Sequence, residues 1–166
     1  MSKYKKTVDE KTLTLVIERR FQAPKQRVWD AYSTRELLQQ WWSPEHFSTT
    51  IKIFEFRPGG RWHYHMTGPD GTKYWSLAIY RAICDGVSIE YEDYFSDEQG
   101  GANSSLPSTR THLAFRTDES DTIVTTALKF ASLDALQQLL KMGFEQGFAS
   151  TCDKLDMLLA QASRPA

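Results

Sequence analysis

The sequence is poor in the features that mark secreted and membrane-spanning proteins. It has only two cysteines among 166 residues, Cys84 and Cys152, which is too few for the disulfide framework of a small secreted domain. We expect both to be unpaired, buried thiols. No stretch approaches the roughly 20 apolar residues that span a bilayer, and the first residues contain no apolar signal segment. These absences predict a cytoplasmic protein without a membrane span.

An excess of charge of either sign is also missing. The 20 basic and 21 acidic residues leave a formal net charge of -1, and the basic residues are scattered along the chain. Lys3, Lys5 and Lys6 form a short run that we expect to be solvated. Proteins that bind nucleic acids or anionic membranes concentrate basic side chains on one surface. The charge pattern therefore argues against both kinds of partner.

Aromatic side chains are the abundant component. They make up 13% of the chain, as five tryptophans, seven tyrosines and nine phenylalanines. A chain of this length fits one domain and can bury roughly 70% of the surface that its unfolded form exposes. We therefore expect a single soluble domain, residues 1–166, in which most of these rings are packed.

Alternation of apolar and polar residues predicts a sheet. The first strand covers residues 13–21, and from residue 47 onward the period of two continues. Turn signals rich in glycine, proline and aspartate separate most of the strands, and such short connections permit only antiparallel neighbours. The predicted strands are residues 13–21, 49–56, 61–66, 72–84, 87–95, 109–117 and 122–130.

Three helices are predicted. Pro24 suits the start of a short helix over residues 25–32, and the capping-box spacing of residues 33–36 predicts a second helix over residues 34–42. From residue 133 onward, apolar residues three, four or seven positions apart predict one amphipathic helix of about thirty residues, roughly 45 Å long. Ser132 is the expected N-cap, and residues 163–165 should end the helix.

Two glycines stand in the middle of this long predicted helix. Gly147 points the same way as the flanking leucines, and Gly143 lies at the edge of the apolar stripe. A glycine inside a helix costs about 1 kcal/mol relative to alanine. Either another backbone approaches closely at this point, or the small residues leave space beneath the helix. The sequence favours neither explanation over the other.

The elements together predict an α+β helix-grip fold, in which a curved antiparallel sheet of about six or seven strands wraps around a long C-terminal helix. Two short helices follow the first strand. Motifs spread over residues 12–160 then resemble those of START-like (SRPBCC) proteins, in the subgroup of homologues of the activator of the heat-shock-protein-90 ATPase. They are Arg20-Phe21-x-Ala23-Pro24-x-x-x-Val28-Trp29-x-Ala31, Glu36-x-x-x-x-Trp41-Trp42-x-Pro44, Arg57-Pro58-Gly59-Gly60-Arg61-Trp62, Pro69-Asp70-Gly71 and Gly143-x-x-x-Gly147-Phe148.

The resemblance implies a fold more than an activity. Members of this superfamily include lipid carriers, plant-hormone receptors, polyketide cyclases, ring-hydroxylase subunits and the co-chaperone itself, so one fold serves several functions. The subgroup often has Gly-x-Tyr where this chain has Ala78-Ile79-Tyr80. Packing at this point is therefore expected to differ.

His63 and His65 alternate along one strand, a spacing that can hold a metal. A third ligand would have to come from His46, His112 or a carboxylate, and no close spacing supplies one. Trp62, Tyr64 and Met66 occupy the other face in phase with the apolar residues. We therefore expect the histidines to face solvent and predict neither a metal nor a cofactor.

No serine or cysteine stands in a sequence setting typical of a nucleophile, and no catalytic residue is predicted. Glu92, Asp93 or His112 could act as an acid or base if one of them faced a cavity. Strand phase places Asp93 with Ile89, Tyr91 and Phe95 on the apolar face. A carboxylate satisfied inside the core is the other interpretation of Asp93.

The aromatic residues support a binding pocket. Each ring alone is explained by core packing, but together with the small residues of the C-terminal helix they describe an apolar pocket with a few hydroxyl and indole N–H groups. We predict that its ligand-binding residues are Trp42, Phe54, Trp62, Tyr64, Tyr80, Tyr91, Phe95, Phe144, Gly147 and Phe148.

Three functions follow from this interpretation. The leading hypothesis is a non-enzymatic binding domain for a small hydrophobic or aromatic molecule, held between the sheet and the C-terminal helix. The second is a protein-interaction module that regulates a heat-shock-protein-90-type ATPase, with a chaperone or another protein as partner. The third is a cyclase- or hydrolase-like enzyme. The long polar loop at residues 96–108 is the predicted door of the pocket.

Overall fold

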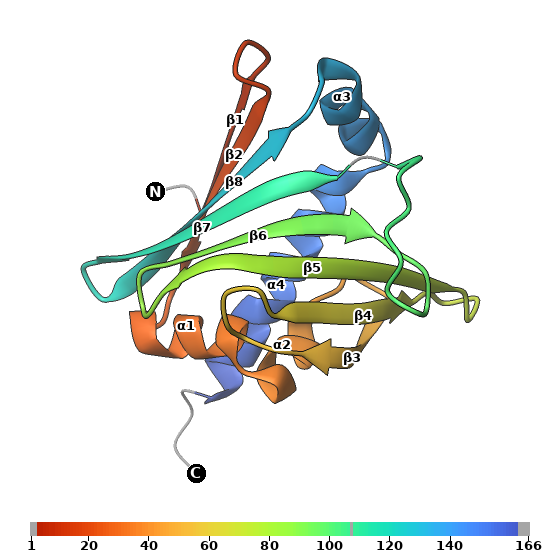
Figure 1. The fold of residues 1–166 in the computed structure, drawn as a ribbon. Helices are drawn as coiled ribbons and strands as arrows, with labels where there is room; N and C mark the ends of the chain where they lie inside the picture. The colour runs from red at the N-terminus through yellow and green to blue at the C-terminus, as the bar shows by residue number, and fades with distance from the viewer. Residues whose placement is uncertain (1–2, 107, 163–166) are drawn as a thin grey trace.

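The computed structural model describes residues 3–106 and 108–162. Its strands form one antiparallel sheet in the order β1-β2-β8-β7-β6-β5-β4-β3 (Figure 1). The edges are the first and third strands, because β2 pairs with the last strand instead of with β3. The strands are β1 Tyr4–Asp9, β2 Thr14–Phe21, β3 Ser48–Phe54, β4 Arg61–Thr67, β5 Lys73–Cys84, β6 Ser88–Phe95, β7 Thr109–Asp118 and β8 Asp121–Phe130.

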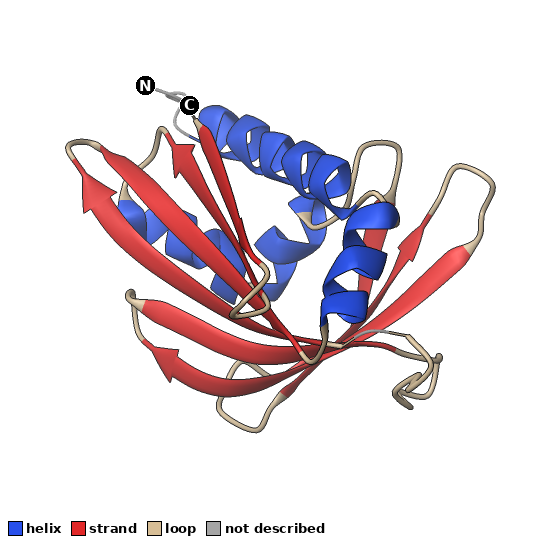
Figure 2. Ribbon diagram, turned by 90° about the horizontal axis from the view of Figure 1, so that it is seen from above, coloured by secondary structure: helices blue, strands red, loops and turns tan. Residues whose placement is uncertain are grey.

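The sheet curls around the helices (Figure 2). Two short helices, α1 Lys25–Ser33 and α2 Arg35–Trp41, follow β2, while α3 Leu133–Lys141 and α4 Phe144–Ala162 follow the last strand. The predicted α+β helix-grip fold is confirmed, with eight strands rather than six or seven. Within the part of the chain that the structure describes, no helix is both long and apolar enough to cross a bilayer.

The additional strand is β1, whose first residues belong to the short basic run that the sequence predicts to be solvated. Five of its six residues are exposed, so it has no buried face to produce an alternating pattern. It is held by its ladder to β2 and by a turn in which the Asp9 carboxylate accepts hydrogen bonds from the backbone N–H of Lys11 (2.9 Å) and Thr12 (3.2 Å). A strand stabilised mainly by its backbone leaves little trace in the side-chain pattern, and charged residues suit a sheet edge.

The C-terminal segment is two helices, which corrects the prediction of one continuous rod. Gly143 interrupts it with a φ of +84°, a left-handed conformation that is easy only for glycine. At the end of α3, the backbone N–H of Gly143 donates to the Leu140 carbonyl at 3.2 Å. The backbone N–H of Met142 donates to the Gln138 carbonyl at 3.1 Å. The start of α3 agrees with the prediction, since Ser132 Oγ accepts a hydrogen bond from the Ala135 N–H at 3.1 Å.

Gly147 lies inside α4 and needs no unusual backbone conformation. A Cβ atom at this position would lie 3.5 Å from Cγ of Pro44, an ordinary van der Waals contact, and would meet no backbone atom within 4 Å. The two glycines therefore have different origins. Gly143 permits the break between the helices, whereas Gly147 leaves space beside Pro44.

Ion pairs and hydrogen bonds fasten α4 to the rest of the protein. Arg19, buried on the inner face of β2, contacts Asp153 at 2.8 Å and Asp156 at 2.5 Å. Near the other end of the helix, Lys6 of β1 contacts Glu145 at 2.6 Å. The helix is thus anchored to the β1–β2 side of the sheet over most of its length.

Two smaller predictions are wrong. Cys84 is exposed rather than buried, while Cys152 is buried as expected and both are free. Burial raises the pKa of the Cys152 thiol to about 12. The capping box predicted over residues 33–36 does not form, because Ser33 ends α1 and its hydroxyl donates to the Trp29 carbonyl at 2.8 Å. Thr34, the residue before α2, makes no side-chain capping hydrogen bond, although the helix begins close to the predicted place.

The two glycines should respond in opposite ways to alanine. Gly143→Ala forces a side chain into a left-handed conformation, which costs roughly 1–2 kcal/mol, so the free energy of unfolding should fall. Gly147→Ala should raise it by up to about 1 kcal/mol, because alanine is the better helix former and its Cβ has room. Urea unfolding of the two variants measures both changes. A loss of stability in Gly147→Ala would contradict this account of the helix.

Candidate ligand-binding site

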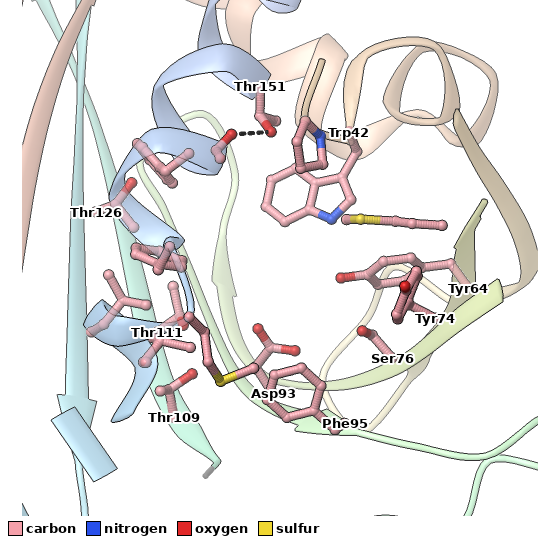
Figure 3. A pocket seen from close by; sticks show the side chains of 18 of the residues that line it. Trp42, Tyr64, Tyr74, Ser76, Asp93, Phe95, Thr109, Thr111, Thr126 and Thr151 are labelled. Atoms are coloured by element: carbon pink, nitrogen blue, oxygen red, sulfur yellow. Dashed lines mark hydrogen bonds between the residues drawn. The ribbon is translucent and has the colours of Figure 1, made fainter. Parts of the chain in front are cut away.

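A cavity of about 400 Å³ lies between the concave face of the sheet and the junction of α3 and α4 (Figure 3). Its walls are predominantly apolar and aromatic. The residues that line it are Tyr32, Trp42, Pro44, Phe47, Tyr64, Met66, Tyr74, Ser76, Tyr91, Asp93, Tyr94, Phe95, Thr109, Thr111, Leu113, Thr126, Leu128, Leu139, Met142, Gly143, Phe144, Gly147, Phe148 and Thr151.

The C-terminal segment covers the cavity where its two helices meet. Met142 and Gly143 form the break, and Phe144, Gly147 and Phe148 follow on the first turns of α4. The rings of Phe144 and Phe148 are 5.7 Å apart. The face of α4 at Gly147 thus borders the empty space. The bulkier residues on either side of Gly147 are packed.

A short segment after α2 supplies another wall. Trp42, Pro44 and Phe47 line the cavity, and the segment is tied to α4 by Lys154, whose ammonium donates to Ser43 Oγ at 2.7 Å and to the Phe47 carbonyl at 2.8 Å. Desolvation by burial lowers the pKa of Lys154. This wall and the helix are therefore held together as one unit.

Threonines from β7 and β8 face the cavity from the sheet. Thr109 and Thr111 alternate in phase with Leu113, and Thr126 alternates in phase with Leu128, so strand geometry places all of them on the inner face. The Thr111 hydroxyl is buried and has no hydrogen-bond partner among the described residues. These hydroxyls were missed at the level of sequence, although their phase with the apolar residues was the signal that could have found them.

Asp93 is the charged residue of the cavity. It stands on β6 in phase with Tyr91 and Phe95, directly opposite Thr109 of β7, and Figure 3 shows its carboxyl group pointing into the open space. The interpretation of Asp93 as a satisfied core carboxylate is wrong. Among the described residues, none donates a hydrogen bond to it or forms an ion pair with it.

The surroundings of Asp93 make its charge costly. The carboxyl retains accessible surface because it faces the cavity, yet protein encloses it, and this desolvation raises its pKa from 3.8 to about 7. The same burial, together with the nearby Asp93 charge, raises the pKa of Tyr64 and that of Tyr91 above the ordinary value. The cavity thus disfavours negative charge.

A second unsatisfied polar group lies across the cavity from Asp93. The Tyr64 hydroxyl lies near Trp42 and Ser76, but the indole Nε1 of Trp42 is buried without a hydrogen-bond partner in the described structure. The ring of Trp42 packs edge-on against Trp62, with centroids 4.8 Å apart. The indole N–H of Trp42 therefore lies within the wall of the cavity, beside the Tyr64 hydroxyl.

The mouth of the cavity is marked by two lining residues that are half exposed. Tyr74, near the start of β5, has 53% of its surface accessible, and Met142, at the helix break, has 52%. The ring of Phe47 lies 6.0 Å from that of Tyr74. The exposed part of the lining thus lies at the start of β5 and at the helix break.

Seven of the ten predicted site residues line the cavity, namely Trp42, Tyr64, Tyr91, Phe95, Phe144, Gly147 and Phe148. The other three lie elsewhere. Trp62 and Tyr80 are buried in the core, where their rings stack 6.5 Å apart, and Phe54 packs against Tyr80. Trp42 stands over Trp62 and separates it from the cavity, so strand alternation predicted the face of Trp62 correctly but not its depth.

The two histidines of β4 are placed on the predicted face but are not solvent-exposed. Trp62 and Tyr64 face the core while His63 and His65 lie on the outer side of the sheet, where only 1% and 8% of their surfaces are accessible. The ring of Trp75 covers both, at 4.8 and 4.6 Å. Within the described residues, no group of three potential metal ligands is found.

The loop at residues 96–108 does not cover the cavity. Its described part crosses the outer side of the sheet, where the Asp97 carbonyl contacts His63 Nε2 at 3.0 Å and the Glu98 carbonyl accepts a hydrogen bond from Lys52 at 2.8 Å. Residues 96–106 contribute no side chain to the lining. This position does not support a door, and Pro107 lies outside the described residues.

Comparisons with known proteins agree with this architecture. The chain is similar to protein Ms6760 from Mycobacterium smegmatis, with 36% identity, a TM-score of 0.87, and coverage of 93% of this chain and 95% of that one. A protein from Arthrobacter aurescens is 30% identical, with a TM-score of 0.90 over 99% of this chain and 94% of its own. A third, from Staphylococcus epidermidis, is 33% identical, with a TM-score of 0.82 over 96% and 97%.

No curated protein matches the chain. The family described as Activator of Hsp90 ATPase homolog 1-like protein matches residues 22–160, which confirms the resemblance drawn from the sequence motifs. The chain belongs to the family of Activator of Hsp90 ATPase homolog 1-like proteins.

Proposed function

We propose that this protein is a non-enzymatic binding domain that holds a small hydrophobic or aromatic molecule in the cavity between the sheet and the α3–α4 junction. The cavity itself carries the proposal. Its volume of about 400 Å³ lies within the range of roughly 300–1,000 Å³ typical of small-molecule sites. Protein interiors otherwise pack without voids of this size.

The lining supports a ligand that is mostly apolar and carries a few polar atoms. Aromatic rings from the sheet, α2 and α4 surround the space, and the polar groups among them are few and fixed in place. This combination is typical of small-molecule sites, in which apolar walls supply affinity and isolated polar groups orient the ligand. The predicted residues that line the cavity are the proposed contacts, joined by Asp93 and Thr111.

The two alternatives draw less support. A co-chaperone role rests on the description of the family, and it would use an outer surface rather than an enclosed hollow. An enzyme would need an acid or base with a partner placed beside a substrate. Asp93 has hydroxyl groups around it, but no second acid, histidine or lysine among the described residues lines the cavity.

A ligand carried through purification would be direct evidence. We expect native mass spectrometry of the purified protein to show a bound small molecule that is released on denaturation, since desolvated apolar ligands leave closed sites slowly. The same preparation after unfolding and refolding in clean buffer serves as the control. A protein that stays empty and takes up no hydrophobic dye would contradict the proposal.

Filling the cavity should abolish binding without unfolding the protein. Gly147 lines the cavity, and a Cβ atom there would contact only the Pro44 side chain, at 3.5 Å, so Gly147→Leu extends its side chain towards the cavity. We expect binding of the neutral dye Nile red to weaken at least tenfold while the melting temperature stays unchanged. Gly147→Ala is the matched control and should keep binding. A falling melting temperature with unchanged dye binding would contradict the assignment.

The buried acid predicts an unusual pH dependence of stability. Aspartate in an unfolded chain titrates near pH 3.9, whereas the pKa of Asp93 is about 7. Between these values the folded protein keeps a proton that the unfolded chain has lost, so Asp93 lowers stability as pH rises through this window. Asp93→Asn should therefore gain stability relative to wild type by up to about 1.4 kcal/mol per pH unit from pH 4 to 7.

The neighbouring Glu92 provides the opposite case. Hydrogen bonds from Arg81, Tyr94 and Arg110 lower the pKa of Glu92 to about 2. The stability that ionised Glu92 gives the folded protein is present above the pKa of a glutamate in the unfolded chain. It is lost as the pH falls towards 2. Glu92→Gln should therefore be less stable than wild type at neutral pH, and the difference should close in acid.

Urea unfolding across this pH range measures both variants, Asp93→Asn and Glu92→Gln. Parallel curves for Asp93→Asn and wild type would contradict the placement of Asp93.

A further inference from the structure

We propose that the cavity selects apolar or aromatic molecules that carry a protonated amine, and that the Asp93 carboxylate is the counter-ion of this amine. The inference rests on the proposed function, since it names the class of ligand that the same cavity holds. It begins from a charge that the folded protein leaves unbalanced.

The cavity contains an acid but no base. Its ionisable lining residues are Asp93 and five tyrosines, and no lysine, arginine or histidine of the described chain is among them. The elements around Asp93 add no cation: Ala78 of β5 and Thr109 of β7 flank it in the sheet, and Met142 lines the same cavity at the helix junction. Enclosed charges in proteins are normally paired or neutralised by a proton, and a ligand that carries a cation would supply the partner that the protein does not.

The outer face of the same strand shows the contrast. Glu92, one position earlier on β6, contacts Arg81 at 3.0 Å and Arg110 at 2.9 Å. The protein thus supplies two cations to an acid near the surface and none to the acid in the cavity. An unpaired carboxyl group in an apolar site lowers stability, which a ligand that supplies the positive charge would reverse.

The rings around the cavity suit a cation as well. Tyr64, Tyr91 and Trp42 line the walls, and the faces of such rings attract ammonium groups most strongly when water is excluded. An ammonium group beside Asp93 would therefore meet a carboxylate on one side and aromatic faces on others. A cavity hydroxyl such as that of Ser76 can accept one of its remaining N–H groups.

The far side of the cavity adds an apolar surface for the rest of the ligand. The Trp42 Nε1 atom has no accessible surface, and the Tyr64 hydroxyl lies beside it, so the Trp42 ring and not its N–H borders the open space (Figure 3). The preferred ligand is thus an aromatic molecule with a protonated amine at the end that meets Asp93.

Three probes of one shape test the charge. Naphthylethylamine, naphthylethanol and naphthylacetate share an aromatic body and differ in carrying a positive, neutral or negative group. We expect isothermal titration calorimetry of the full chain at about pH 8 to show the amine binding at least tenfold more tightly than the alcohol, and the acid binding most weakly. In Asp93→Asn the amine should bind no more tightly than the alcohol, because an enclosed ammonium then lacks a counter-ion, while the alcohol still binds.

Two controls separate this effect from general electrostatics. Glu92→Gln removes a negative charge one residue away on the outer face and should keep the preference for the amine. Lowering the pH from about 8 to about 6 should weaken amine binding to wild type, because Asp93 with a pKa of about 7 takes up a proton, but not to Asp93→Asn. The amine itself stays protonated throughout.

The outcomes distinguish the two proposals. Binding of the alcohol with no preference for the amine would overturn the counter-ion role of Asp93 and leave the cavity as a binding site. Tighter binding of the acid would overturn it as well. Failure of every probe to bind the wild-type protein would overturn the proposed function together with this inference.

Discussion

The hollow in this protein depends on how one segment covers the concave face of the sheet. The C-terminal chain packs tightly at both ends and is interrupted between them, at Gly143. On one side, the end of α4 joins α1 and α2 in a large aromatic core cluster, and on the other, α3 joins a smaller aliphatic cluster around Leu15 and Leu128. Members of both clusters line the cavity, which therefore lies between two well-packed regions.

This arrangement explains how an empty space is tolerated. A void in a close-packed interior costs stability because its walls lack contacts, and the fold offsets this cost with rigid surroundings. Arg19 ties β2 to α4, and Lys154 ties α4 to the wall that contains Pro44 and Phe47. These contacts lie outside the cavity and fix the positions of its walls. The two clusters therefore do not collapse onto each other.

The polar groups inside the cavity have no structural role that the folded protein reveals. Buried polar groups are normally hydrogen-bonded, and the indole of Trp42 and the hydroxyl of Thr111 are exceptions in the described structure. Asp93 is a more costly one, because desolvation opposes its ionisation. Groups that lower stability without a local partner are typical of sites that bind something else, and Asp93 is such a group in this cavity.

The sequence by itself determined the fold class, the strand faces and the family, because these depend on local periodicity and on motifs in order. Alternation placed Trp62 inward and His63 outward, and it placed Asp93 on the inner face. The tertiary structure alone decided what covers each face. A loop distant in sequence buries His63, Trp42 shields Trp62, and Gly143 ends a helix whose apolar stripe continues past it. Depth and enclosure arise from contacts between distant segments, and periodicity carries no information about them.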